Sequence, residues 1–201
     1  MDRTIRQMRS IASDFKTRED GEALTIEGYF AVFNSNYDIA PGMSESIAPG
    51  AFSDTLSGDI RALVNHDTTL VLGRTTAHTL ELSQDERGLW GKIVINPKDG
   101  DAMNLYERVK RGDVNQCSFG FDITDEESTI SENGDIHWTI KKVVLYEVSC
   151  CTFPAYEETN ISARSADRDR IMERKAEAWR TKMKERLRNY GTETDHAEEE
   201  D

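Results

Sequence analysis

The chain has 201 residues, enough for one domain with additional elements or for two small domains. Hydrophobic residues make up 37% of it and charged residues 31%, which indicates an ordinary core with solvated appendages. The net charge of −13 argues against nucleic acid as a partner, because a nucleic-acid reader needs a basic surface. No apolar run approaches the length of a membrane span, so we expect no membrane partner either.

The cysteines and the first residues favour a reducing, intracellular compartment. Cys117, Cys150 and Cys151 have neither the spacing of a disulfide framework nor that of a CxxC zinc site. The opening stretch, MDRTIRQMRSIASDF, is charged and lacks an apolar run of signal-peptide length. We therefore expect the protein to be cytoplasmic where it is made.

The amino-acid composition changes at residue 24. Residues 1–23 are polar and mixed in charge, which predicts a mobile N-terminal arm. Short runs rich in β-branched and aromatic residues follow, separated by turn signals such as APG and ENGD. The predicted strands are 24–33, 60–66, 69–82, 88–96, 116–124, 136–145 and 146–153. Many short strands with turns between them predict a mainly β fold, either a barrel or a sandwich.

Two helices interrupt the predicted strands. Residues 49–56 could form a short one. A better candidate spans roughly 99–111, where Asp99 or Asp101 can cap the start and Gly112 suits the position just past the end.

The composition shifts again near residue 164. Apolar side chains recur at spacings of three and four, which predicts an amphipathic helix over 165–190 with a narrow stripe. The stripe consists of Met172, Ala176, Trp179, Met183, Leu187 and Tyr190. This helix either packs on the parent domain or is joined to it by a flexible linker and binds a partner, for example as a coiled coil. The polar stretch before the helix slightly favours the linker. The acidic end, GTETDHAEEED, predicts disorder. The predicted domains are therefore 1–23, 24–163 and 164–201.

Strand alternation points to two inward-facing polar residues. In IRALVNHD (60–67), His66 falls on the face of apolar neighbours, where a histidine is more often a core residue than a catalytic base. In VVLYEVSCCTF (143–153), Glu147 falls on a largely apolar face. A buried carboxylate needs a partner, and a structural ion pair is the more common arrangement.

The stretch NQCSFGF (115–121) places two candidate nucleophiles on opposite faces of one strand. Cys117 shares its face with Phe119 and Phe121, which is typical of an inert thiol in a core. Ser118 lies on the sparser face beside Gly120, whose missing side chain lets another chain approach closely.

Three of these residues supply the groups for nucleophilic acyl transfer. Ser118 would attack, His66 would take its proton, and Glu147 would orient the imidazole and stabilise its charge. Sequence spacing does not show that they converge, because triads occur in unrelated chain orders. The sequence has no GxSxG motif, which excludes an α/β-hydrolase, and no cluster with metal-ligand spacing. We expect neither a metal nor a cofactor.

Five segments carry a resemblance to a known family. They are APGAF (48–52), LVNHD with LG following (63–73), RGLW (87–90), GDVNQCSFGF (112–121) and LYEVSCCTFPAYEETNI (145–161). Together they resemble the tailed-phage prohead proteases, capsid maturation enzymes related to herpesvirus assemblin. The likeness is collinear over about residues 24–161.

The resemblance implies a serine endopeptidase acting inside an assembling procapsid in the host cytoplasm. Its substrates would be scaffold or the scaffolding part of the major capsid protein, and itself by autocleavage. The implied fold is a compact barrel of about seven strands with flanking helices, and the herpesvirus branch implies a homodimer.

Carried over residue by residue, the resemblance makes His66 the base and Ser118 the nucleophile. Glu147 sits where the family keeps a glutamate before V-S and where the herpesvirus relatives place a second histidine, so its role is the least fixed of the three. For the oxyanion hole we expect backbone N–H groups near Thr152 and Phe153.

Two other functions stay open at this point. In the first, the chain is a non-enzymatic capsid assembly or scaffold-binding protein, and His66, Ser118 and Glu147 form a structural hydrogen-bond network. In the second it is a cysteine hydrolase that uses Cys117, against which the apolar neighbours of that thiol argue.

Overall fold

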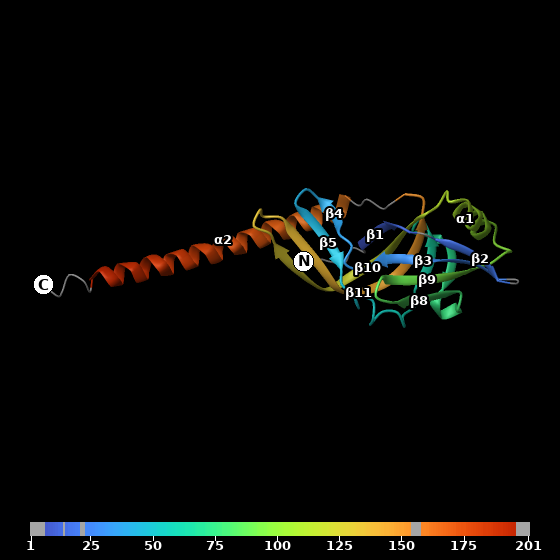
Figure 1. The fold of residues 1–201 in the computed structure, drawn as a ribbon, viewed down its shortest axis with the longest axis horizontal. Helices are drawn as coiled ribbons and strands as arrows, with labels where there is room; N and C mark the ends of the chain where they lie inside the picture. The colour runs from blue at the N-terminus through green and yellow to red at the C-terminus, as the bar shows by residue number, and fades with distance from the viewer. Residues whose placement is uncertain (1–6, 14, 21–22, 154–157, 196–201) are drawn as a thin grey trace. The chain divides into compact units, whose positions relative to one another are not determined.

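The computed structural model describes residues 7–13, 15–20, 23–153 and 158–195 (Figure 1). The chain divides into two units, Met1–Glu157 and Glu158–Asp201. The first unit holds two β-sheets and one short α-helix, and the second holds a long helix. The mainly β fold with additional helices is therefore confirmed.

A seven-stranded sheet carries the candidate site residues. Along its main path the order is β1 (Gln7–Ala12), β10 (Gln116–Ile130), β11 (Ile136–Cys151), β5 (Met43–Ile47) and β4 (Tyr37–Ala40). Two further strands, β6 (Arg61–Val64) and β7 (Asp67–Arg74), join it through the pairing of β6 with β11. Strands β10 and β11 form a long antiparallel hairpin at the centre of this sheet. Strands β5 and β6 pair in parallel with β11, each at a different end of it.

A four-stranded sheet covers the other side of the core. Its order is β2 (Lys16–Asp20), β3 (Ala23–Val32), β9 (Gly88–Ile95) and β8 (Leu80–Gln84). Side chains of both sheets meet in one apolar cluster, for example Phe30 and Leu89 from this sheet and Phe119 and Val148 from the other. Burying an aromatic or branched side chain contributes about 1.5–3 kcal/mol, so this cluster is the main source of stability.

The predicted barrel of about seven strands is wrong in count and closure. The described residues form eleven strands in two separate sheets. Sequence patterns missed β4 and β5 because β5, MSESI, mixes polar residues with apolar ones although most of it is buried. They also joined β7 and β8 into one strand across the 3-10 turn Thr75–Ala77, and split β11 into two.

The predicted mobile arm, residues 1–23, contains two strands instead. Pairing of β1 with β10 aligns Ser10 with Ser118, and β2 pairs with β3. Arg9 on β1 reaches the carboxylate of Glu45 on β5, and both side chains are buried. These are long-range contacts, which the local polarity of the segment does not reveal.

The helix predicted over 99–111 is confirmed as α1 (Gly100–Arg111). Asp99 is its cap, since its side chain accepts hydrogen bonds from two backbone N–H groups of the first turn. Gly112 follows the end with φ of 84°, a left-handed conformation that glycine adopts without strain. The short helix expected at 49–56 is wrong: that segment is a succession of turns, anchored by the buried ring of Phe52.

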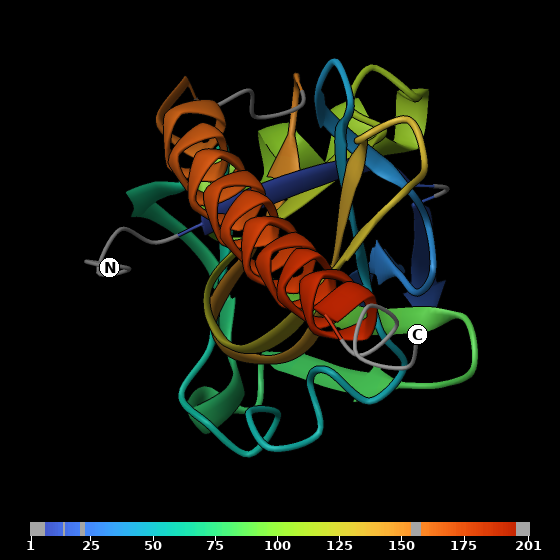
Figure 2. The ribbon, with the colours of Figure 1, turned by 90° about the vertical axis from the view of Figure 1, so that its left-hand side faces the viewer.

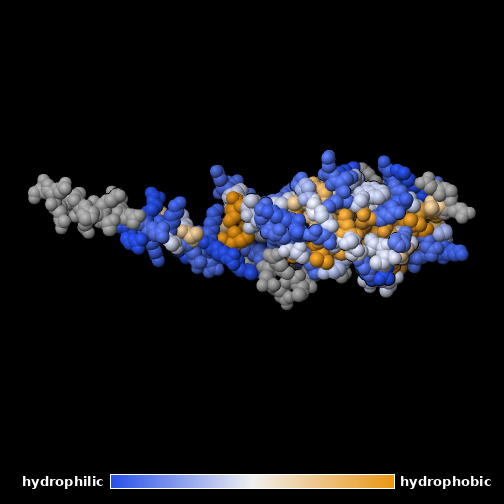
Figure 3. All heavy atoms as spheres, turned by 90° about the horizontal axis from the view of Figure 1, so that it is seen from below, coloured by the Kyte–Doolittle hydropathy of each residue, from blue (hydrophilic) through white to orange (hydrophobic). Residues whose placement is uncertain are grey.

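The second unit contains α2 (Glu158–Asp195), drawn from orange to red in Figure 2. It includes and extends the helix predicted over 165–190. Figure 3 shows hydrophilic residues over much of its surface. Two of its apolar side chains, Met172 and Trp179, are exposed. Of the acidic end predicted to be disordered (191–201), residues 191–195 belong to α2, so the prediction is wrong there, and residues 196–201 lie outside the described residues.

Candidate active site

The candidate base, His66, lies in the tight turn between β6 and β7. Asn65 and His66 both have left-handed backbones, with φ of 50° and 62°. Such conformations are costly for residues other than glycine and concentrate at functional sites. The end of β11 holds the turn in place: Asn65 N–H donates to the Cys150 carbonyl at 3.0 Å, and Asn65 Oδ1 accepts from Thr152 N–H at 2.9 Å.

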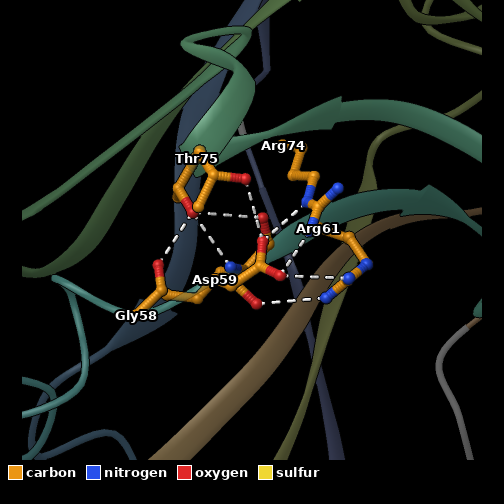
Figure 4. A network of polar contacts seen from close by, with 7 residues as sticks. Gly58, Asp59, Arg61, Arg74 and Thr75 are labelled. Carbon is orange, nitrogen blue, oxygen red and sulfur yellow. Dashed lines mark hydrogen bonds and ion pairs between the residues drawn. The ribbon is translucent and has the colours of Figure 1, made fainter.

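An ion-pair network holds the opposite end of the same hairpin (Figure 4). Asp59 accepts two hydrogen bonds from Arg74, at 2.7 and 2.6 Å, and one from Arg61 at 3.1 Å. The bond from Arg74 is the main reason why the pKa of Asp59 lies well below its usual range. The hairpin that presents His66 is thus fixed both at its base and at its turn.

Glu147 on β11 binds the imidazole of His66. Glu147 Oε1 lies 2.7 Å from His66 Nδ1, and the carboxylate is almost completely buried. Its other oxygen, Oε2, accepts a hydrogen bond from the Ser149 hydroxyl at 2.6 Å. A carboxylate on Nδ1 leaves Nε2 as the nitrogen that can take a proton from a nucleophile.

Ser118 lies on the strand beside this pair. In the β10–β11 register it stands directly opposite Ser149, whose Oγ accepts from His66 N–H at 3.2 Å, and Gly120 stands opposite Glu147. Directly opposite residues share one face of a sheet. Ser118, Ser149 and Glu147 therefore lie on the same face, which also holds the His66 turn.

Burial distinguishes the hydroxyl of Ser118 from its neighbours. The residue is fully buried, and Ser118 Oγ has no hydrogen-bond partner among the residues that the structure describes. Glu147 is also buried, and 17% of the His66 side chain is exposed. The site expected on an exposed surface is instead enclosed, with His66 as its most accessible member.

Two cysteines lie near the site, and neither is poised as a nucleophile. The Cys151 thiol is 3.8 Å from His66 Nε2, and burial together with the charge of Glu147 raises its pKa to about 12. Cys117 points to the other face, where its thiol contacts the Tyr29 carbonyl at 3.1 Å, and burial raises its pKa. Since the thiolate is the reactive form, the structure argues against a cysteine hydrolase.

One of the two residues expected to form an oxyanion hole has its backbone N–H engaged elsewhere. The N–H of Thr152 is already bound to the side chain of Asn65. The side chain of Phe153 is 79% exposed. The Thr152 N–H is therefore a structural donor that fixes the His66 turn.

Sequence reasoning missed the role of Ser149 in this arrangement. Alternation places Ser149 on the face of Glu147, and that signal was available in the stretch EVS.

Within the described ranges, no group of three or more His, Cys, Asp and Glu side chains is arranged to hold a metal ion. None of the helices described is both long and apolar enough to cross a membrane.

A family model described as "Caudovirus prohead serine protease" matches residues 12–174. The chain belongs to this family. The match spans most of the 201 residues and confirms the resemblance to the prohead proteases drawn from the sequence motifs.

Comparisons with individual proteins gave a similar sequence and a similar structure. The chain is 32% identical over 155 residues to the prohead protease of Enterobacteria phage HK97. That alignment covers 75% of this chain and 64% of the relative, so the chain spans less than two thirds of the relative's length. Among solved structures, the capsid assembly protease of bacteriophage T4 is similar with a TM-score of 0.48 and 9% identity, over 73% of this chain and 96% of that one.

Proposed function

We propose that this chain is a serine endopeptidase of phage prohead maturation, with Ser118 as nucleophile, His66 as general base and Glu147 as the residue that orients the base. Membership of the prohead serine protease family supports the class of enzyme. The observation that carries the residue assignment is the 2.7 Å contact of a buried carboxylate with His66 Nδ1, on the sheet face that holds an unpartnered serine hydroxyl.

In the proposed reaction each of these three groups has one role. Ser118 Oγ attacks the carbonyl carbon of the scissile peptide bond while His66 Nε2 takes the hydroxyl proton. The buried charge of Glu147 stabilises the imidazolium that forms, and the imidazolium then gives its proton to the leaving amine. Water repeats the sequence on the acyl-enzyme and restores Ser118. Because Ser118 is enclosed, substrate binding must include an opening of this face.

The proposed substrates are scaffold or the scaffolding part of the major capsid protein, and the protease itself by autocleavage. The proposed place is the assembling procapsid in the host cytoplasm, where confinement raises the effective concentration of substrate. A homodimer and a herpesvirus-like fold remain predictions from the motif resemblance.

The deciding experiment is co-expression of the major capsid protein with wild-type chain or with Ser118→Ala, followed by mass spectrometry of both proteins. The account expects defined cleavage products with the wild type and none with Ser118→Ala, while the variant is still incorporated into proheads. The alternative, a non-enzymatic assembly protein with a structural His–Ser–Glu network, requires uncleaved capsid protein and uncleaved chain in both samples.

A further inference from the structure

We propose that Ser149 is a positioning residue of this protease, whose single hydroxyl fixes both the base and the carboxylate. The proposal rests on the proposed function and extends it to a residue outside the expected triad. Ser149 is fully buried in β11, two residues after Glu147 and on the same face.

The hydroxyl of Ser149 makes two hydrogen bonds with different partners. It donates to Glu147 Oε2 at 2.6 Å, and it accepts from the backbone N–H of His66 at 3.2 Å. With Oε1 on the imidazole, both oxygens of Glu147 are held, so the carboxylate has one orientation. The same hydroxyl ties down the backbone from which the imidazole extends.

These hydrogen bonds also separate Ser149 from the nucleophile. Its proton is directed to Glu147, and its oxygen faces the backbone of His66 and not Nε2 of the ring. Ser118, directly opposite, has a buried Oγ without a partner among the described residues. Of the two serines, Ser118 is therefore free to attack and Ser149 is engaged.

Loss of this hydroxyl has two consequences for the base. Without the Ser149 donor, the negative charge of Glu147 is shared with fewer partners and acts more strongly on His66. The protonated imidazole is then stabilised, so the acidic limb of the rate profile moves to higher pH. The carboxylate also loses its second anchor, which lowers the rate at the pH optimum.

Among the residues that the structure describes, few other charged groups lie around the base. Cys151 on β11 has its thiol near Nε2 and stays protonated. Arg61, beside Glu147 on β6, is engaged in the exposed Asp59 ion pair. On β7, Asp67 is exposed. From β10, the third strand against the site, Ser118 and Gly120 face it and neither carries a charge.

The hairpin geometry allows the variant to fold. Asn65 binds the end of β11 through its own backbone and side chain, independently of Ser149. Ser149→Ala is therefore expected to keep the His66 turn in place. If the protein does not fold, Ser149→Cys, which fills the same space with a weaker donor, is measured instead.

The test measures the rate at which diisopropyl fluorophosphate phosphorylates the full chain, as a function of pH. In this reaction Ser118 Oγ bonds to phosphorus, fluoride leaves and His66 takes the proton. For Ser149→Ala we expect a rate about 10- to 100-fold lower at the optimum, because the variant loses one hydrogen bond to a charged group. We also expect the acidic limb of its rate profile to lie at higher pH. Ser149→Thr, which keeps the hydroxyl, should restore the limb.

Ser46→Ala is the matched control. It removes a buried hydroxyl of the same sheet that contacts His137 Nε2 at 2.8 Å, and it should change neither rate nor limb. A Ser149→Ala variant with wild-type rate and limb would overturn the positioning role alone. Complete loss of labelling in Ser149→Ala, with the label on Ser149 in the wild type, would make Ser149 the nucleophile. A wild type that takes no label and leaves the co-expressed capsid protein uncleaved would overturn the proposed function and this proposal with it.

Discussion

One histidine lies at each end of β11 and contacts serine: His137 is within the strand, and His66 is in the β6–β7 turn that binds the strand's other end. His137 has both ring nitrogens bound to hydroxyls, Nδ1 to Ser44 at 2.9 Å and Nε2 to Ser46 at 2.8 Å. His66 has a buried carboxylate on Nδ1 and a thiol 3.8 Å from Nε2. Contact with serines is therefore common to both histidines, whereas the carboxylate on one ring nitrogen, with the other nitrogen not bound to a hydroxyl of the described residues, belongs to His66.

The largest expected effect separates these two histidines. His66→Ala should lower cleavage of the co-expressed capsid protein by roughly 10³-fold or more, because the serine proton then has no acceptor. His137→Ala should leave the cleavage rate close to that of the wild type. Densitometry of the products over time measures both. Equal losses of cleavage in the two variants would contradict a catalytic role for His66 that His137 lacks.

The next effect separates two buried glutamates of the same sheet. Glu147→Gln should reduce cleavage by roughly 10²- to 10⁴-fold, because an amide does not stabilise the imidazolium. Glu45→Gln should mainly destabilise the fold, by about 3 kcal/mol, since it leaves Arg9 buried without its carboxylate. Cleavage rates and urea unfolding of both variants distinguish these outcomes. If Glu147 were purely structural, Glu147→Gln would mainly lower the free energy of unfolding, as expected for Glu45→Gln.

The smallest effect concerns the base of the hairpin that carries His66. The pKa of Asp59 is lowered by its bonds to Arg74, so its contribution to stability is present above the unfolded value, about 4, and is lost as the pH falls through the folded value. Asp59→Asn should therefore melt at a lower temperature than the wild type at pH 7. The difference should shrink towards pH 3 in thermal scans, and a constant difference would refute the ion-pair account.

How far the sequence predicted the fold depends on the range of the contacts involved. Helix α1 was predictable because its cap Asp99 and its end Gly112 are local signals. Strands β1 and β2 were not, because their partners lie far along the chain and their own residues are polar. The two-sheet arrangement likewise follows from long-range pairing that periodicity does not encode.

The sequence suggested the members of the candidate site, and much less of its geometry. Alternation correctly separated Ser118 from Cys117, since the pairing of β10 with β11 is regular over residues 116–120. It placed His66 in a strand, whereas the left-handed residues Asn65 and His66 form a turn that ends the alternation. The hydrogen bonds of Ser149 to Glu147 and His66, and the burial of Ser118, depend on neighbouring strands. They became visible only in the structure.

The most direct test of the account is the position of an organophosphate label. The full chain is treated with diisopropyl fluorophosphate, digested and sequenced by tandem mass spectrometry, alongside His66→Ala. The account predicts a single modified residue, Ser118, in the wild type and none in the variant. A label on any other residue, or equal labelling of Ser118 without the imidazole, would contradict it.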